Sequence, residues 1–163
     1  MEPEENHQGL DTLVAWQKAR EVMLFVHKQV APTLPTDEKW DLTSQIQRAS
    51  KSAMANIAEG YGRFYYQETI RFCYIARGSL VETYNHLVTA LDLNYISRSL
   101  YDDGVALIEA THRTLNGYIA YLKRNKRGGE LPGGRLQETA LTYEWEPEND
   151  APFPNPELPF PNP

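Results

Sequence analysis

The sequence predicts an all-α protein, an antiparallel up-down-up-down four-helix bundle followed by an extended acidic, proline-rich C-terminal tail. Apolar residues recur at spacings of three and four in four long segments, which is the periodicity of amphipathic helices. The connections between the segments are about 5 to 12 residues long, which suits antiparallel neighbours in a bundle. No convincing strand pattern interrupts the helical segments.

The first two helices are expected over about residues 12–31 and 42–60. Asp11 is the expected N-cap of the first helix, and Pro32 is one of its stops. Small residues in the core stripe of the second helix would let a neighbouring helix approach closely. The expected stripes are Leu13, Trp16, Arg20, Met23, His27 and Val30 in the first helix, and Ile46, Ala49, Ala53 and Ile57 in the second.

The third helix is expected over about residues 67–92, and the fourth runs from an N-cap at Ser97 to about residue 124. Gly78 and Gly117 lie inside these helices, where each costs on the order of 1 kcal/mol relative to Ala, so we expect close backbone contacts there. The expected stripes are Cys73, Ala76, Leu80, Tyr84, Leu87 and Leu91, then Ile108, Thr111, Leu115, Tyr118, Ile119 and Leu122.

Composition divides the chain into an acidic N-terminal extension (1–10), the bundle (11–127) and the tail (128–163). The net charge of −6 is concentrated at the two ends, and residues 12–127 carry 15 basic and 11 acidic side chains. No apolar run is long enough to span a membrane, and the single cysteine, Cys73, fits a buried thiol in a reducing compartment. We therefore expect a soluble cytoplasmic protein.

The tail contains eight of the eleven prolines and repeats the motif PFPNP at residues 152–156 and 159–163. Proline repeats with aromatic residues favour extended polyproline geometry, which is typical of peptides that dock on a partner. An acidic tail of this composition is equally typical of disordered chain. Both interpretations remain open from the sequence.

The stretch NIAEGYGR, residues 56–63, raises the question of catalysis. Asn56 and Glu59 share a helix face, but neither has a histidine or a second acid at helical spacing, so a structural role is favoured. Gly60 and Gly62 lack the spacing of a phosphate-binding loop and indicate a helix stop and turn. We expect no catalytic residues.

A metal site in a four-helix bundle would need Glu-x-x-His on two helices and a glutamate on each of the others. Glu109 and His112 supply one such pair, and the sequence has no second copy. Half a ligand set coordinates a divalent cation poorly. We expect neither a metal nor another cofactor.

Basic residues offer a better candidate site. They gather in the second and third helices and at the end of the fourth, with Tyr61, Phe64, Tyr65 and Tyr66 among them. Arginine binds phosphate through its fork of donors, and exposed aromatic rings stack on unpaired bases. The predicted nucleic-acid-binding residues are Arg48, Lys51, Arg63, Arg71, Arg77, Lys123, Arg124, Lys126 and Arg127.

Several stretches resemble a bacterial family of four-helix bundles. They are VAWQKAR (14–20), LTSQIQRA (42–49), ANIAEGYGR (55–63) and IRFCYIARGSLVET (70–83), followed by DLNYIS. The family includes the proteins encoded by intervening sequences in large-subunit ribosomal RNA genes and the accessory variability determinants of diversity-generating retroelements. The resemblance covers about residues 10–125.

The resemblance implies a protomer that assembles into a ring-like homopentamer without known catalytic residues. In the retroelement members it further implies a basic surface that binds nucleic acid and the reverse transcriptase. The leading hypothesis is therefore a non-enzymatic, oligomeric accessory protein that binds RNA or DNA and a reverse-transcriptase-type partner. The alternative is a protein-interaction scaffold whose C-terminal tail recruits a partner, without nucleic-acid binding.

Overall fold

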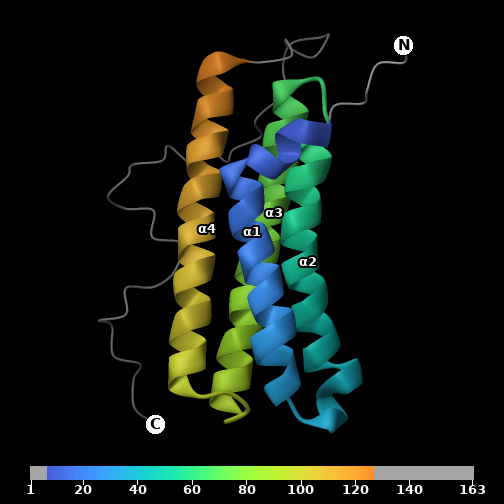
Figure 1. Cartoon of the computed structure of the whole chain (residues 1–163), viewed down its shortest axis with the longest axis vertical. Helices are drawn as coiled ribbons and strands as arrows, with labels where there is room; N and C mark the ends of the chain where they lie inside the picture. The colour runs from blue at the N-terminus through green and yellow to red at the C-terminus, as the bar shows by residue number, and fades with distance from the viewer. Residues whose placement is uncertain (1–6, 127–163) are drawn as a thin grey trace, which may run out of the picture. The chain divides into compact units, whose positions relative to one another are not determined.

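The computed structural model describes residues 7–126, and these residues form a four-helix bundle (Figure 1). The predicted tail, residues 128–163, and most of the predicted N-terminal extension lie outside the described residues. Short helical turns, His7–Thr12, Val26–Val30, Ala31–Thr33 and Thr36–Trp40, precede or connect the first two long helices. The long helices are α1 (Val14–Phe25), α2 (Leu42–Tyr61), α3 (Tyr66–Asp92) and α4 (Arg98–Asn125).

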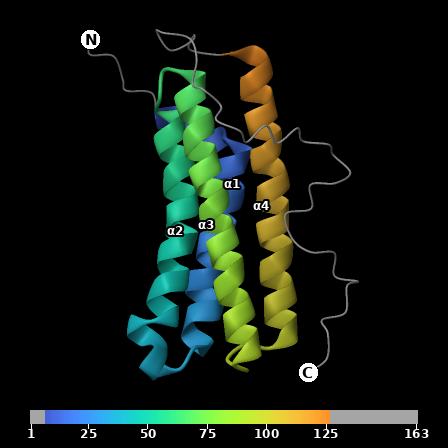
Figure 2. The same ribbon diagram turned by 180° about the vertical axis from the view of Figure 1, so that it is seen from behind.

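Successive helices run in opposite directions, which confirms the predicted up-down-up-down bundle. α1 and α3 lie on opposite sides of the bundle, with α2 and α4 between them on either flank (Figures 1 and 2). One end of the bundle therefore holds the α2–α3 connection and the C-terminus of α4. The other end holds the α1–α2 and α3–α4 connections, where the Tyr95 hydroxyl donates a hydrogen bond to Glu38 Oε1 at 3.0 Å.

The predicted stripe of the first helix was wrong except at Val30, because the core side of α1 is formed by a different set of residues. Arg20 is exposed, and Trp16 and Met23 are only half-buried. The N-cap is Leu13 rather than Asp11, since a short 3-10 helix, His7–Thr12, precedes α1. The buried side chains of this segment are Ala15, Ala19, Val22, Phe25, Val26 and Val30.

The stripe of α2 was predicted correctly. Ile46, Ala49, Ala53 and Ile57 are all buried, and α2 packs along α3 more extensively than any other pair of helices. Of the stripes in α3 and α4, only Tyr84, Leu91 and Tyr118 remain half-buried. Ser97 caps α4 as expected, because its hydroxyl accepts a hydrogen bond from the Leu100 amide at 3.1 Å.

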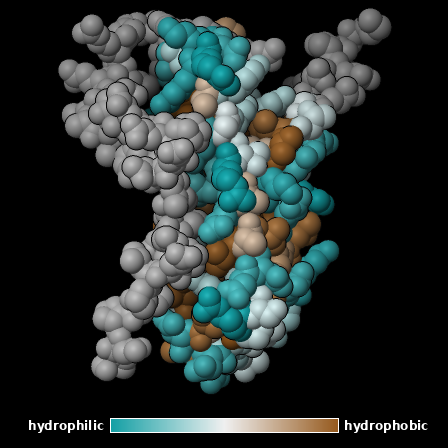
Figure 3. All heavy atoms as spheres, turned by 90° about the vertical axis from the view of Figure 1, so that its left-hand side faces the viewer, coloured by the Kyte–Doolittle hydropathy of each residue, from teal (hydrophilic) through white to brown (hydrophobic). Residues whose placement is uncertain are grey.

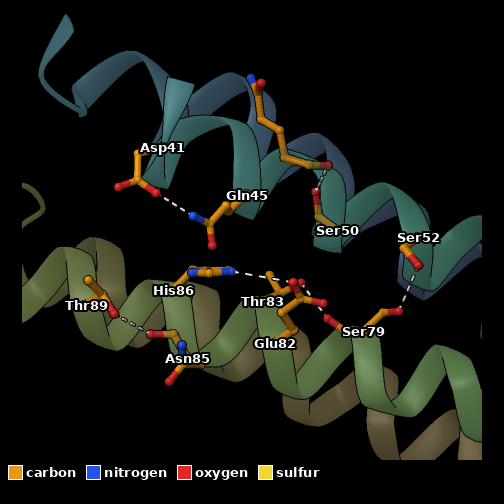
Figure 4. Close-up of polar contacts among 11 residues, drawn as sticks. Asp41, Gln45, Ser50, Ser52, Ser79, Glu82, Thr83, Asn85, His86 and Thr89 are labelled. Atoms are coloured by element: carbon orange, nitrogen blue, oxygen red, sulfur yellow. Dashed lines mark hydrogen bonds and ion pairs between the residues drawn. The ribbon is translucent and has the colours of Figure 1, made fainter. Parts of the chain in front are cut away.

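Hydroxyl groups line the seam between α2 and α3 (Figure 4). The Ser52 and Ser79 hydroxyls are 2.9 Å apart across the seam, and buried Thr83 donates to the Ser79 carbonyl at 2.8 Å. One turn further, His86 Nε2 lies 3.7 Å from Glu82 Oε1. Because each hydroxyl finds a partner, the two helices approach closely without leaving these oxygens unpaired.

Gly60 lies in the last turn of α2 and is buried against α3. A Cβ atom at this position would lie 2.8 Å from the Cβ of Phe72 and 3.1 Å from the Thr69 carbonyl oxygen. α2 ends one residue later, at Tyr61, with Gly62 as its C-cap. Gly62 thus forms the predicted helix stop, whereas Gly60 permits close helix packing.

The close contacts expected at Gly78 and Gly117 are absent. Both glycines are exposed, and a Cβ atom added to either would meet nothing within 4 Å. The sequence predicts that both glycines lie within helices, but it does not determine which face of each helix is exposed to solvent. Their cost to helix stability is therefore not offset by packing within residues 7–126.

Cys73 is buried in the core, as predicted. Burial raises the pKa of its thiol to about 12, because the thiolate would lose its hydration. The thiol is therefore protonated at neutral pH and is not poised as a nucleophile.

None of the helices in residues 7–126 has the length and apolarity needed to cross a membrane.

Candidate nucleic-acid interface

Charge is distributed unevenly along the bundle. At the end that holds the α1–α2 and α3–α4 connections, acidic residues dominate. At the end where α2 and α4 finish, most of the predicted basic residues are found, and Glu59 and Glu68 are the acids of α2 and α3 nearest to them. The acids of the first end are Asp37, Glu38, Asp41, Asp92, Asp102 and Asp103.

Two of the predicted cations converge between α3 and α4. The guanidinium carbon of Arg77 lies 5.5 Å from the ring centre of Tyr74, and Lys123 Nζ lies 5.9 Å from the same ring. Arg77 also donates a hydrogen bond to Asn116 Oδ1 at 3.3 Å. We refer to Tyr74, Arg77, Asn116 and Lys123 as the α3–α4 basic cluster. Two positive charges therefore lie within 6 Å of the centre of one exposed ring.

Arg63 occupies the connection between α2 and α3. Its guanidinium pairs with Glu59 four residues earlier and lies 5.0 Å from the ring centre of Phe72. Both partners of the Arg63–Glu59 pair are substantially exposed, so the pair contributes little to stability. Arg63 can therefore exchange this partner for another anion.

The other predicted residues divide into two groups. Arg71, Arg124 and Lys126 are exposed at the same end of the bundle as Arg63. Arg48 and Lys51 are exposed on α2. In the view from behind, α3 lies between α2 and α4 (Figure 2). The fold thus separates this last pair from the α3–α4 basic cluster. Arg127 lies outside the described residues.

The aromatic residues predicted beside these cations are unequally exposed. Phe64 is 72% exposed and Tyr61 is 39% exposed, whereas Tyr65 and Tyr66 are half-buried. Tyr65 meets the Phe64 ring edge to face at 5.1 Å between ring centres. Tyr74 and Asn116 were missed as site residues, because their role depends on the contact between α3 and α4.

The residues considered for catalysis or for metal binding contact neighbouring residues of the bundle or are buried in it. Asn56 donates to the Ser52 carbonyl at 2.8 Å, and Glu59 pairs with Arg63. Glu109 lies 3.9 Å from Arg113, and His112 is buried. In the part of the chain that the structure describes, no three His, Cys, Asp or Glu side chains lie close enough together to hold a metal ion.

The fold is therefore that of a small all-α protein, a four-helix bundle with a basic end. The family model for the 23S rRNA-intervening sequence protein matches residues 11–117, and the chain belongs to this family. The family is not known for an enzymatic activity. No curated protein matches the chain with significant similarity.

Proposed function

We propose that the protein is a non-enzymatic, oligomeric accessory protein that binds single-stranded or structured nucleic acid through the basic end of its bundle. The observation that carries the proposal is the convergence of Arg77 and Lys123 on Tyr74. Two neighbouring cations on rigid helices suit a chain of phosphates, because phosphate contacts supply most of the affinity of sequence-independent binding. The protein partner that we propose, a reverse-transcriptase-type enzyme, rests on the family resemblance alone.

The matched test compares two pairs of cations in the full-length protein. Replacing Arg77 and Lys123 with glutamine removes the two charges of the α3–α4 basic cluster. Replacing Arg48 and Lys51 with glutamine removes the same charge from α2. At about 0.1 M salt each lost phosphate contact weakens single-strand binding about fivefold, so we expect the first pair to weaken it about 25-fold. The second pair should weaken binding only slightly, through the change in net charge.

Fluorescence anisotropy with a labelled RNA octamer measures both affinities. Equal weakening by the two pairs would contradict the assignment of the α3–α4 basic cluster. If the wild-type protein bound no RNA or DNA strand even at low salt, the nucleic-acid role would be lost. The remaining function would then be the alternative, a scaffold whose C-terminal tail recruits a protein partner.

Apolar side chains at the surface support self-association. Ile75 and Val81 on α3 are each 44% exposed and flank the exposed Gly78. Apolar patches also reach the surface on the side where α4 lies (Figure 3). A glycine between two apolar residues lets a second helix approach closely, so we propose α3 as part of a contact between protomers. From the family resemblance we propose that the assembly is a homopentamer.

Sedimentation velocity tests this contact. The wild-type protein should sediment as an oligomer at micromolar concentration, and the substitutions Ile75→Lys and Val81→Lys together should dissociate it, because they bring like charges into the contact. A stable wild-type monomer of 18.7 kDa would refute the proposed assembly.

A further inference from the structure

A cleft opens at the basic end of the bundle and is not part of the α3–α4 basic cluster. Its volume is about 670 Å³, within the range of small-molecule sites. The residues that line it come from the short helix His7–Thr12, the start of α1, the end of α2 with its connection to α3, Thr69 of α3, and the second half of α4. We call it the terminal cleft. Its aromatic side chains are Tyr61, Phe64, Tyr118 and Tyr121.

Local packing shapes the walls of the terminal cleft. Gly9 lies so close to Tyr61 that a Cβ atom there would be 1.9 Å from the tyrosine hydroxyl, so the glycine leaves room for this ring. Phe64 keeps most of its ring exposed while Tyr65 contacts its edge. The cleft also contains a cationic side chain, Arg63. It therefore combines flat apolar rings with one positive charge.

We infer that the terminal cleft binds an unpaired base of a single-stranded nucleic acid, with Arg63 on the adjoining phosphate. Aromatic rings stack on any base through its π-face, and arginine supplies a forked donor for the phosphate. An apolar peptide would use the same rings but would make no use of the Arg63 guanidinium, which can exchange its exposed partner Glu59 for a phosphate. Charge complementarity therefore favours a nucleotide over an apolar peptide as the occupant.

The terminal cleft and the α3–α4 basic cluster lie on two sides of the same helix, α4. Tyr118 and Tyr121 line the cleft on the α1 side of α4, whereas Asn116 and Lys123 meet α3 residues on its other side. One helix, with a diameter of about 10 Å including side chains, separates the two sites. A strand of a few nucleotides can place phosphates on the α3–α4 basic cluster and a base in the cleft. The inference therefore rests on the proposed function, in which the α3–α4 basic cluster binds phosphates.

The test separates base contacts from phosphate contacts in the full-length protein. The probes are a labelled RNA octamer and an abasic octamer with the same number of phosphates. We expect Phe64→Ala and Tyr121→Ala each to weaken binding of the RNA octamer about tenfold, since each removes a stacking surface. Neither substitution should change binding of the abasic octamer. Both side chains are exposed, so the bundle should fold normally.

The control is Trp40→Ala, which removes an 84% exposed aromatic ring with Lys39 Nζ 4.9 Å from its centre, at the acidic end. It should leave binding of both probes unchanged. If the two cleft variants bind both octamers as the wild type does, with normal salt dependence, the terminal cleft is not a base site but the proposed function stands. Equal weakening for both octamers would also overturn the base site. Failure of the wild type to bind either octamer would remove both proposals.

Discussion

Substituting leucine for Gly60 will lower the free energy of unfolding by about 3 kcal/mol or more, because overpacking a tight contact forces the backbone or neighbouring side chains to shift. The atoms that meet a new Cβ here are the Cβ of Phe72, at 2.8 Å, and the backbone oxygen of Thr69. Neither is the end of a flexible side chain. α2 and α3 must therefore move apart at this contact.

Gly117→Leu is the matched control, because Gly117 is also a helical glycine but is exposed, with open space around its Cβ direction. This substitution should raise the free energy of unfolding by about 0.5–1 kcal/mol, since leucine favours the helix more than glycine does. Urea unfolding followed by circular dichroism measures both changes. A Gly60→Leu protein as stable as the Gly117→Leu protein would show that α2 and α3 do not meet as described.

The second large effect concerns nucleic-acid affinity. Five positive charges at the basic end belong to α3, α4 and the α2–α3 connection. Removing all five should weaken single-strand binding by about 3 × 10³-fold at about 0.1 M salt, if each makes one phosphate contact. The loss should be the same for unrelated sequences, because phosphates carry no base identity. The substituted residues, each replaced by glutamine, are Arg63, Arg71, Arg77, Lys123 and Arg124.

Binding measurements with several RNA and DNA strands of equal length test this prediction. Uniform weakening is the expected pattern, and circular dichroism should show an unchanged helix content because four of these five side chains are exposed. Weakening confined to one sequence would instead assign these residues to direct reading of bases. That result would contradict their role as phosphate contacts.

The helices themselves could be predicted because each long segment repeats apolar residues at helical spacing between clear stops. The core face of α1 could not, since two interleaved stripes satisfy the same spacing. One begins at Leu13 and includes Arg20; the other begins at Ala15 and includes Ala19. Both have the required period, and only packing against α2 and α4 decides between them. α2 offered a single apolar stripe, so its buried face was predicted correctly.

The candidate site was predicted as a set of residue types rather than as an arrangement. Arg77 and Lys123 are far apart in the sequence, and their convergence depends on which faces of α3 and α4 meet. Tyr74 was not predicted as a site residue, because nothing in its local sequence links it to Lys123. The terminal cleft was missed for the same reason, since segments far apart in the sequence form it.

The salt dependence of binding tests the central claim, that the basic end of the bundle contacts phosphates. An RNA octamer is titrated with the full-length protein and with the variant carrying all five glutamines, at several salt concentrations. Each phosphate contact contributes about −0.7 to the slope of log K against log salt for a single strand, so the slope of the variant should be shallower by about 3.5. Identical slopes for the two proteins would place the phosphate contacts elsewhere and contradict the claim.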